Sequence, residues 1–362
     1  MKRILLATTA LFALSGVTVA AADVSVSGHV RFQYDAWSDK TEDGVTKSGS
    51  FDDKTGLPKV TDVPGSGNNN NSMSTDPEIW IKGNMVTDSG LTVAPEIRLN
   101  NLHDSSKAAS ARHYIKLADD WGTLTLGRQH SVARTMSLDA DWRGTVSGAD
   151  VPAGAEISEN VLKSSAIGAY AGDPAVIYQT PDFSGFQAGV YFSDAGAKSK
   201  ANATDIALTY SIDAFDDGGV KIGYISNRLA GKDGENATKK NDNNQIGVEL
   251  TSGDLMASVV QTKTKATPKS GGTADKQTAQ ELEVAYSATD SLTLNMVYFT
   301  SKNDEGTAMG DKYKSTGVGV KYTIAPGLWT SLGYTTFKHT PKAAGSKANE
   351  GNGMRIRVHA GF

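Results

Sequence analysis

The sequence GMRIRVHAGF, residues 353–362, alternates between apolar side chains and basic or small ones. Met354, Ile356 and Val358 fall at every second position, and Arg355 lies between the first two. Because successive side chains of a strand point to opposite faces, this segment would have one apolar face and one cationic face. A soluble β-sandwich could use one such strand, so the fold class depends on how often the pattern recurs.

The same period of two recurs along nearly the whole chain. Residues 24–34 alternate in this way, and so do about fifteen later segments, of which 255–262 is the least regular. Residues 38–75 are rich in Gly, Asn, Asp, Lys and Ser, which predicts a long exposed loop. Short polar connections are expected at 213–219, 252–254, 288–290 and 323–327, and long ones near 194–203, 228–242, 263–276, 301–311 and 338–350. This alternation of short and long connections is typical of a transmembrane antiparallel β-barrel, here of about sixteen strands.

Aromatic residues separate this barrel from a soluble sandwich. Amphipathic rings at both ends of an apolar band are typical of two membrane interfaces, whereas a sandwich buries its aromatic residues in mid-strand. The rings at one level are Tyr178, Tyr210, Tyr286, Tyr322 and Phe362, and those at the other are Tyr34, Phe192, Tyr224, Tyr298 and Tyr334. The all-β transmembrane barrel is therefore the favoured fold class.

The composition and the N-terminal segment exclude or disfavour several classes of function. The 362 residues are 38% hydrophobic and 21% charged and contain no cysteine, which excludes thiol catalysis, cysteine metal sites and disulfides. Met1 to Ala22 has a basic start, an apolar centre and a small-residue end, which predicts a signal peptide that is removed, leaving a single barrel domain over 23–362. Its removal takes away Lys2 and Arg3 and changes the formal net charge from -4 to -6. Nucleic-acid binding is disfavoured by this negative charge.

Two motifs resemble a known family. DWGTLTLGRQ, residues 120–129, is similar to the strand before the constriction loop of Gram-negative general diffusion porins of the alpha-proteobacterial type, and TPDFSGF, residues 180–186, is similar to the turn after it. A terminal Phe362 with apolar residues at alternate positions before it resembles the assembly signal of outer-membrane barrels. The resemblance implies a sixteen-stranded homotrimer in the Gram-negative outer membrane. Its partners would be membrane lipid, lipopolysaccharide and the assembly machinery, and its third loop, about 130–173, would fold inward.

Pore residues follow from the same resemblance and from strand parity. Arg128 matches the family's pore arginine, and His29 matches a basic position of the pore wall. Glu78 and Ile177 each occupy a wall position where related porins carry arginine. Arg31, Arg98 and Arg112 have the parity of the lumen face, where they serve permeation or pair with wall carboxylates such as Glu96. Acidic residues of the predicted constriction loop are Asp139, Asp141, Asp150, Glu156 and Glu159.

A passive, water-filled channel for small hydrophilic solutes and ions is the predicted function, with a weak preference for cations. One alternative is a channel specific for sugars or phosphate; sugar channels line an aromatic slide, and aromatic residues with lumen parity are Trp80, Tyr114, Tyr191 and Trp329. A second alternative is an outer-membrane hydrolase, although the six histidines are scattered along the chain. We expect no enzyme activity and no cofactor. The sequence does not decide whether a loop binds Ca²⁺.

Overall fold

The computed structural model describes residues 23–41, 45–51, 58–64, 69–100, 109–138, 174–193, 201–231, 239–268, 273–306, 309–342 and 348–362. The predicted signal peptide, 1–22, and most of the predicted constriction loop, 139–173, lie outside these residues. Within the described part of the chain, no helix is both long enough and apolar enough to cross a membrane.

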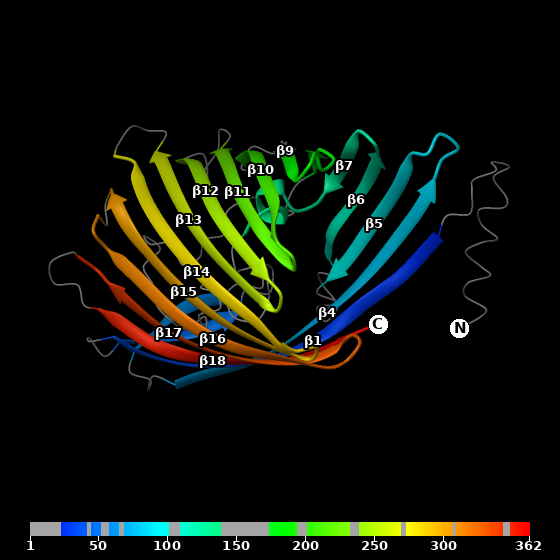
Figure 1. Ribbon diagram of the computed structural model, residues 1–362. Helices are drawn as coiled ribbons and strands as arrows, with labels where there is room; N and C mark the ends of the chain where they lie inside the picture. The colour runs from blue at the N-terminus through cyan, green and yellow to red at the C-terminus, as the bar shows by residue number, and fades with distance from the viewer. Residues whose placement is uncertain are drawn as a thin grey trace.

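Sixteen antiparallel strands of the described chain close into one barrel, as the sequence predicts (Figure 1). Each strand pairs with its neighbour in the barrel, and the first strand, β1, closes the circle by pairing with the last, β18. The strands are β1 (Asp23–Thr41), β4 (Asn69–Val86), β5 (Thr92–Asn100), β6 (Ala109–Asp119), β7 (Gly122–Arg128), β8 (Ala175–Gln179), β9 (Phe186–Ser193), β10 (Ala201–Phe215), β11 (Gly218–Gly231), β12 (Lys239–Ser252), β13 (Leu255–Pro268), β14 (Asp275–Thr289), β15 (Leu292–Glu305), β16 (Lys312–Ala325), β17 (Leu328–Thr340) and β18 (Asn349–Gly361).

The two faces of the barrel wall differ in chemistry. The outward face carries apolar side chains that remain exposed, for example Ile206 at 46%, Leu208 at 36% and Tyr210 at 44%. The alternate positions of the same strand face inward and include buried polar groups such as Asp205 and Thr209. An apolar outer surface over a polar interior is the arrangement required of strands that cross a lipid bilayer.

The seam between β1 and β18 is held at two levels. The backbone N–H and C=O of Gly28 and Phe362 exchange hydrogen bonds of 3.0 Å, and the Phe362 ring lies over Gly28 on the outward face. A side chain at Gly28 would collide with this ring, because a Cβ there would lie 2.8 Å from Phe362 Cζ. On the inner face Arg355 donates a 2.6 Å hydrogen bond through Nε to Asp35 Oδ1. The seam therefore combines backbone pairing with a buried ion pair.

One prediction of irregular structure is wrong. The segment expected as an exposed loop, 38–75, instead contains the end of β1, the start of β4 and a separate two-stranded sheet of β2 (Val45–Phe51) and β3 (Pro58–Pro64). The ladder between β1 and β4 continues from Asp23 to Ser38. Backbone pairing needs no apolar alternation, so polar sequence beyond the apolar band still forms strands.

The strand at 255–262, which is irregular in sequence, is regular in structure. Val259 faces outward and is 56% exposed, whereas Val260 faces inward and is fully buried. Val260 packs beside Gly247 of the neighbouring strand, where a Cβ would lie 3.1 Å from Val260 Cγ2 and 3.3 Å from Leu138 Cβ. The inner face is therefore apolar at this level because a chain segment inside the barrel covers it.

Candidate functional site

Charged side chains on the inner face of β1, β4 and β5 form one ion-paired cluster. Glu78 accepts hydrogen bonds from Arg98 and, at 3.2 Å, from Trp80 Nε1. The Arg31 guanidinium donates a 2.6 Å hydrogen bond to Asp76. The strand register brings these residues together, since β4 lies between β1 and β5 in the barrel. The structure thus places the predicted residues Arg31, Glu78 and Arg98 in contact with acidic or basic partners on the lumen wall.

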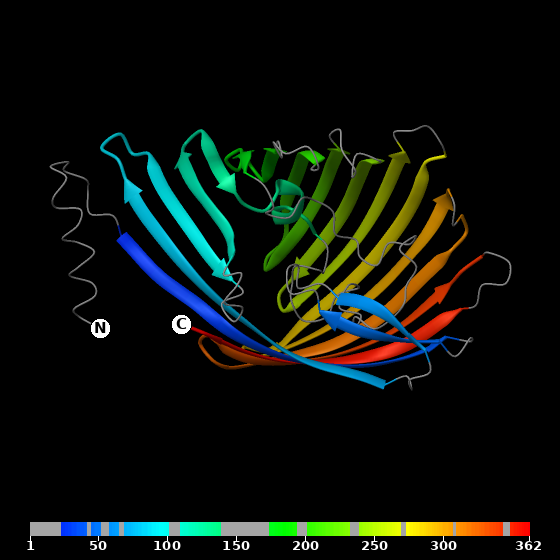
Figure 2. The ribbon, with the colours of Figure 1, turned by 180° about the vertical axis from the view of Figure 1, so that it is seen from behind.

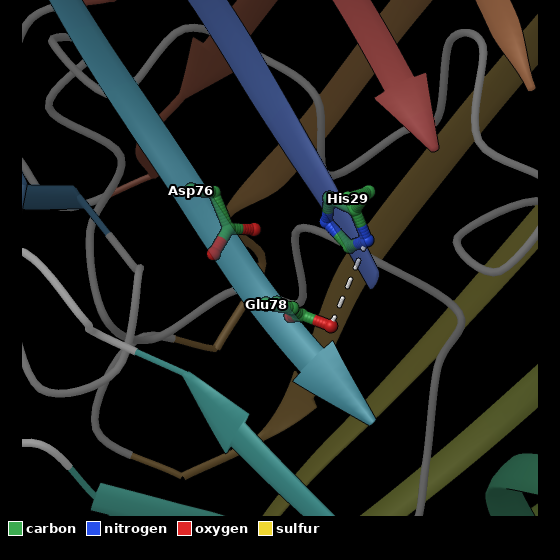
Figure 3. Close-up of side chains that lie close together, drawn as sticks. All are labelled: His29, Asp76 and Glu78. Atoms are coloured by element: carbon green, nitrogen blue, oxygen red, sulfur yellow. Dashed lines mark ion pairs between the residues drawn. The ribbon is translucent and has the colours of Figure 1, made fainter. Parts of the chain in front are cut away.

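His29, Asp76 and Glu78 could together hold a metal ion by geometry alone. Their potential ligand atoms lie within 4.8 Å of one another, and His29 Nδ1 is 3.9 Å from a Glu78 carboxylate oxygen (Figure 3). Both carboxylates, however, already pair with arginines. A cation placed here would meet two guanidinium charges that are attracted to the same oxygens. We therefore interpret the cluster as an ion-paired wall rather than a metal centre.

A stack of four rings runs along the inner face beside this cluster. Trp80 meets His29 edge-on at 6.0 Å, His29 lies 4.6 Å from His359, and His359 stacks on Trp329 at 4.9 Å. Lysines cover the two ends: Lys82 Nζ lies 4.9 Å from the Trp80 ring, and Lys321 Nζ lies 5.0 Å from that of Trp329. The ring faces are engaged by one another and by these cations, so the stack braces the β4–β1–β18–β17 wall and offers no open aromatic slide.

Arg112 of β6, which register places opposite Arg98, joins the lumen wall to the segment that follows β7. Arg112 donates to Gln129 Oε1 at 3.3 Å, and the backbone N–H of His130 donates to the same oxygen at 2.8 Å. Burial, reinforced by the nearby charges of Arg134 and Arg98, lowers the pKa of His130 to about 3. A neutral imidazole can accept a hydrogen bond, which fits the 3.1 Å contact between Arg134 Nη1 and His130 Nδ1. This network holds the chain at the point where it leaves the barrel wall, directly after β7.

Residues 131–138 then run along the inside of the barrel (Figure 2). They include the short helix α2 (Val132–Thr135). The Asp205 side chain on β10 lies beside Ser131 and Ala133 at the start of this helix and accepts a hydrogen bond from Asn227 Nδ2. A helix N-terminus favours an anionic acceptor, because its first N–H groups have no partner within the helix. Asp205 therefore anchors the segment to the wall.

Glycines on the inner wall make room for this segment. A Cβ on Gly189 would lie 2.8 Å from Met136 Sδ and 2.9 Å from Val132 Cγ1. Gly223 and Gly247 leave similar space for Leu138. Around this contact the buried cluster comprises Val132, Ala133, Met136, Ala175, Ile177, Tyr191, Ala203, Ala207 and Ile225. Ile177, which the sequence places at a wall position, is therefore covered by the inward segment rather than open to solvent.

Two groups of predicted pore residues remain, namely Arg128 and the acidic residues of the predicted constriction loop. Strand register pairs Arg128 with His113, on the face opposite to Arg112 and Tyr114, and Gly127 interrupts the pleat with a φ of 127°. Register therefore does not bring Arg128 beside the arginines of β5 and β6, and its role in the pore stays a prediction. The acidic loop residues Asp139, Asp141, Asp150, Glu156 and Glu159 lie outside the described residues.

Sequence reasoning missed the residues that anchor the inward segment. Asp205, Gly189, Gly223 and Gly247 were not among the predicted site residues, although each lies at a lumen-facing position of its strand. A recurrence of glycine at lumen parity on nearby strands was the available signal. Its interpretation requires the register between strands, which the sequence does not supply directly.

Comparisons with known proteins point in one direction. A family model described as Gram-negative porin matches residues 7–350. In-vitro folded OmpT of Vibrio cholerae, in its trimer form, superposes with a TM-score of 0.66 at 15% identity over 94% of this chain and 100% of that one. An anion-selective porin from Comamonas acidovorans gives a TM-score of 0.64 at 13% identity over 94% and 100%. The outer membrane channel DcaP of Acinetobacter baumannii gives 0.59 at 13% over 95% and 98%. No curated protein matches in sequence.

Proposed function

The chain belongs to the Gram-negative porin family, and from that premise we propose a passive, water-filled channel without a dedicated solute. Its location is the outer membrane of a Gram-negative bacterium, and it is a diffusion channel rather than an enzyme. The observation that carries the proposal is the closed barrel with a charged, polar inner face and an exposed apolar outer face. Such a wall conducts water and ions while keeping lipid outside.

The sieve would be formed by the inward segment together with the residues that follow it. Residues 131–138 are pinned to the inner wall by Asp205 and by the glycine recesses. Chain that continues from this anchor starts inside the barrel, which supports a constriction formed by about 130–173. A narrow section with carboxylates on one side and arginines on the other would orient polar solutes and exclude apolar ones.

Selectivity in this proposal is weak and favours cations. The described wall charges are largely mutually compensated, as in the pairs Arg31–Asp76, Arg98–Glu78 and Arg355–Asp35. The sign would then be set by the remaining charges, and the 139–173 segment carries more acidic than basic residues. Screening over ~8 Å at physiological salt keeps the preference small and makes it grow as the salt is diluted.

Assembly and export complete the proposal. We propose a homotrimer, supported by the trimer form reported for the Vibrio cholerae OmpT structure. Residues 1–22 would act as a cleaved signal peptide, and Phe362 as a recognition residue for the assembly machinery. In the folded chain Phe362 is 70% exposed on the outward face.

Liposome swelling with uncharged solutes of increasing size tests the absence of solute specificity. We expect permeation rates to fall smoothly with solute size and to be equal for sugars and polyols of the same radius. A sugar or phosphate that crosses much faster than its size allows, and that blocks the current of other solutes, would instead support the substrate-specific channel.

Partial deletion within 139–160 should raise both the conductance and the size limit; unchanged values in a folded barrel would place this segment outside the constriction.

A further inference from the structure

The short turns at one end of the barrel form an acidic rim. They join consecutive strands at 87–91, 120–121, 180–185, 216–217, 253–254, 290–291 and 326–327. In outer-membrane barrels the short turns face the periplasm. These turns and the three strand residues on either side of each contain nine exposed aspartates and no lysine or arginine. The aspartates are Asp88, Asp119, Asp120, Asp182, Asp213, Asp216, Asp217, Asp254 and Asp290.

These aspartates are spread around most of the rim. Every turn from β4–β5 to β14–β15 has at least one, and only the β16–β17 turn among the described turns has none. Because the strands close into one barrel, the turns follow one another around its edge (Figure 1). Sixteen strands spaced ~4.8 Å apart and tilted by about 45° enclose a rim with a radius of about 17 Å. The carboxylates therefore act together on the mouth of the channel.

Nearby basic residues offset only part of this negative charge. None of the nine carboxylates forms an ion pair with a described residue. Of the lysines that face inward a few residues deeper, Lys82 pairs with Glu96 at 3.8 Å. The others near this end are Lys116, Lys221 and Lys321. The rim thus keeps an excess of negative charge.

The opposite end of the barrel differs. Acidic residues there are ion-paired, as Asp304 is with Lys302 and Glu350 with Lys338, both at 2.9 Å. From β12 to the end of β17, the described residues near the long connections include more lysines than acidic residues. The lysines are Lys239, Lys240, Lys263, Lys265, Lys276, Lys302, Lys312, Lys314, Lys338 and Lys342. Among the described residues, the two mouths of the channel therefore differ in charge.

We propose that the acidic rim sets the cation preference at the periplasmic mouth and so makes the selectivity of the channel asymmetric. This asymmetry rests on the diffusion channel proposed above, and the rim supplies residues that determine its selectivity. Rings of acidic side chains concentrate cations and deplete anions at the mouth of a pore. Nine unit charges about 17 Å from the axis would enrich cations there roughly 1.5-fold at 0.15 M salt and roughly eightfold at 0.01 M. The preference follows the salt on the periplasmic side, because that salt screens the rim.

A hollow at the rim offers a more local alternative. Its volume is about 480 Å³, and its lining includes Asp213, Asp216, Glu249 and Lys221. Lys221 lies opposite Glu249 in the register of β11 and β12. A lysine among these carboxylates opposes a bound cation. We therefore assign the effect to the charge of the whole rim rather than to a cation held in the hollow.

The test is the reversal potential of oriented single channels in a tenfold potassium chloride gradient, applied in each direction. With the dilute solution at the periplasmic mouth, the permeability ratio of K⁺ to Cl⁻ should be roughly two- to fourfold higher than with the gradient reversed. The chain contains no cysteine, so Ser89→Cys in the β4–β5 turn gives a single thiol. After each recording, a polymer-linked maleimide too large to cross the pore is added to one chamber. It should alter the current only when the turns face that chamber.

Two triple variants remove the same charge from different parts of the rim. One neutralises a single turn beside the hollow with Asp213→Asn, Asp216→Asn and Asp217→Asn. The other neutralises three separate turns with Asp88→Asn, Asp120→Asn and Asp290→Asn. Each removes a third of the nine charges, so each should reduce the difference between the two directions by about a third on a logarithmic scale.

The matched control removes three carboxylates from the opposite end of the barrel, with Asp304→Asn, Glu305→Gln and Glu350→Gln. It should not reduce the difference between the two directions. A channel that conducts and prefers cations equally in both directions would overturn the role of the rim and leave the diffusion channel standing. A reduction confined to the triple variant beside the hollow, or an equal reduction in the control, would also overturn it. A folded barrel that conducts no ions would instead contradict the proposed function.

Discussion

Met136 lies directly over Gly189, so that a methyl group on Gly189 would come within 2.8 Å of the Met136 sulfur. This contact joins the inward segment to the wall of β9. Because Asp205 also lies beside Ser131 and Ala133, the start of this loop becomes part of the inner surface of the barrel. The lumen is therefore shaped by the inward segment, residues 131–138, as well as by the side chains of the wall.

The glycine recesses predict a graded loss of stability. Gly189→Ala would press on both Met136 and the β-branched Val132, and should reduce the free energy of unfolding by about 1–3 kcal/mol. Gly223→Ala should cost less, since its nearest neighbour is the flexible tip of Leu138 at 3.2 Å. Urea unfolding of both variants in the same lipid measures the difference. Equal effects, or a larger one at Gly223, would contradict the proposed packing.

The ion pair at the barrel seam predicts strong coupling. Asp35 is 1% exposed and Arg355 is 9% exposed, so removing one partner leaves a buried charge. Arg355→Gln should lower the free energy of unfolding by about 3–5 kcal/mol, whereas adding Asp35→Asn should restore part of the loss. A double-mutant cycle measures this coupling. Additive effects of the two substitutions would show that the pair does not stabilise the closure.

The Arg98–Glu78 pair predicts a shift in ion selectivity. Glu78→Gln removes the negative charge that compensates Arg98 on the lumen wall, so anions should be favoured. A unit charge about 8 Å from a permeating ion contributes about 0.5 kcal/mol in water, or roughly twofold in the permeability of that ion, with opposite signs for cations and anions. Reversal potentials in a salt gradient provide the measurement. Glu305→Gln is the matched control, because Glu305 pairs with Lys276 away from the lumen cluster, and it should leave the ratio unchanged.

His130 predicts a pH dependence of stability. Burial lowers its pKa to about 3, below the value of 6.5 expected in the unfolded chain. The unfolded state therefore takes up a proton first as the pH falls, so the stability present above pH 6.5 decreases towards pH 3. By pH 4.5 the loss would be about 2–3 kcal/mol. His130→Gln lacks the titrating group, and its unfolding free energy should fall less over the same range. Parallel pH profiles for the two proteins would contradict the burial of a neutral His130.

Sequence alone predicts the architecture well because the membrane imposes a repeated pattern. Every crossing needs exposed apolar residues at alternate positions, and Tyr210, Tyr298 and Phe362 mark the edges of the apolar surface. The number of strands and the polar inner wall follow from the same rule. The lumen parity of Arg31 and Arg98 was also predictable, because strand periodicity is local.

Contacts between strands are harder to predict. That Arg98 meets Glu78, and that Asp205 receives the start of α2, depends on register between strands far apart in sequence. Arg128 shows the converse, because its assignment to the pore came from a motif resemblance, whereas the register with β6 pairs it with His113 on the face opposite to Arg112 and Tyr114. The β2–β3 sheet was missed because its polar sequence gives no apolar signal.

Single-channel recording in a planar bilayer with ion substitution tests the central claim most directly. The purified, folded protein should give long-lived, ohmic conductance steps and, in a potassium chloride gradient, a small reversal potential of the sign expected for cation preference. That potential should grow as the salt is diluted, because screening weakens. A folded barrel that conducts no ions would contradict the diffusion channel itself, and a clear anion preference at all salt concentrations would contradict the proposed charge balance.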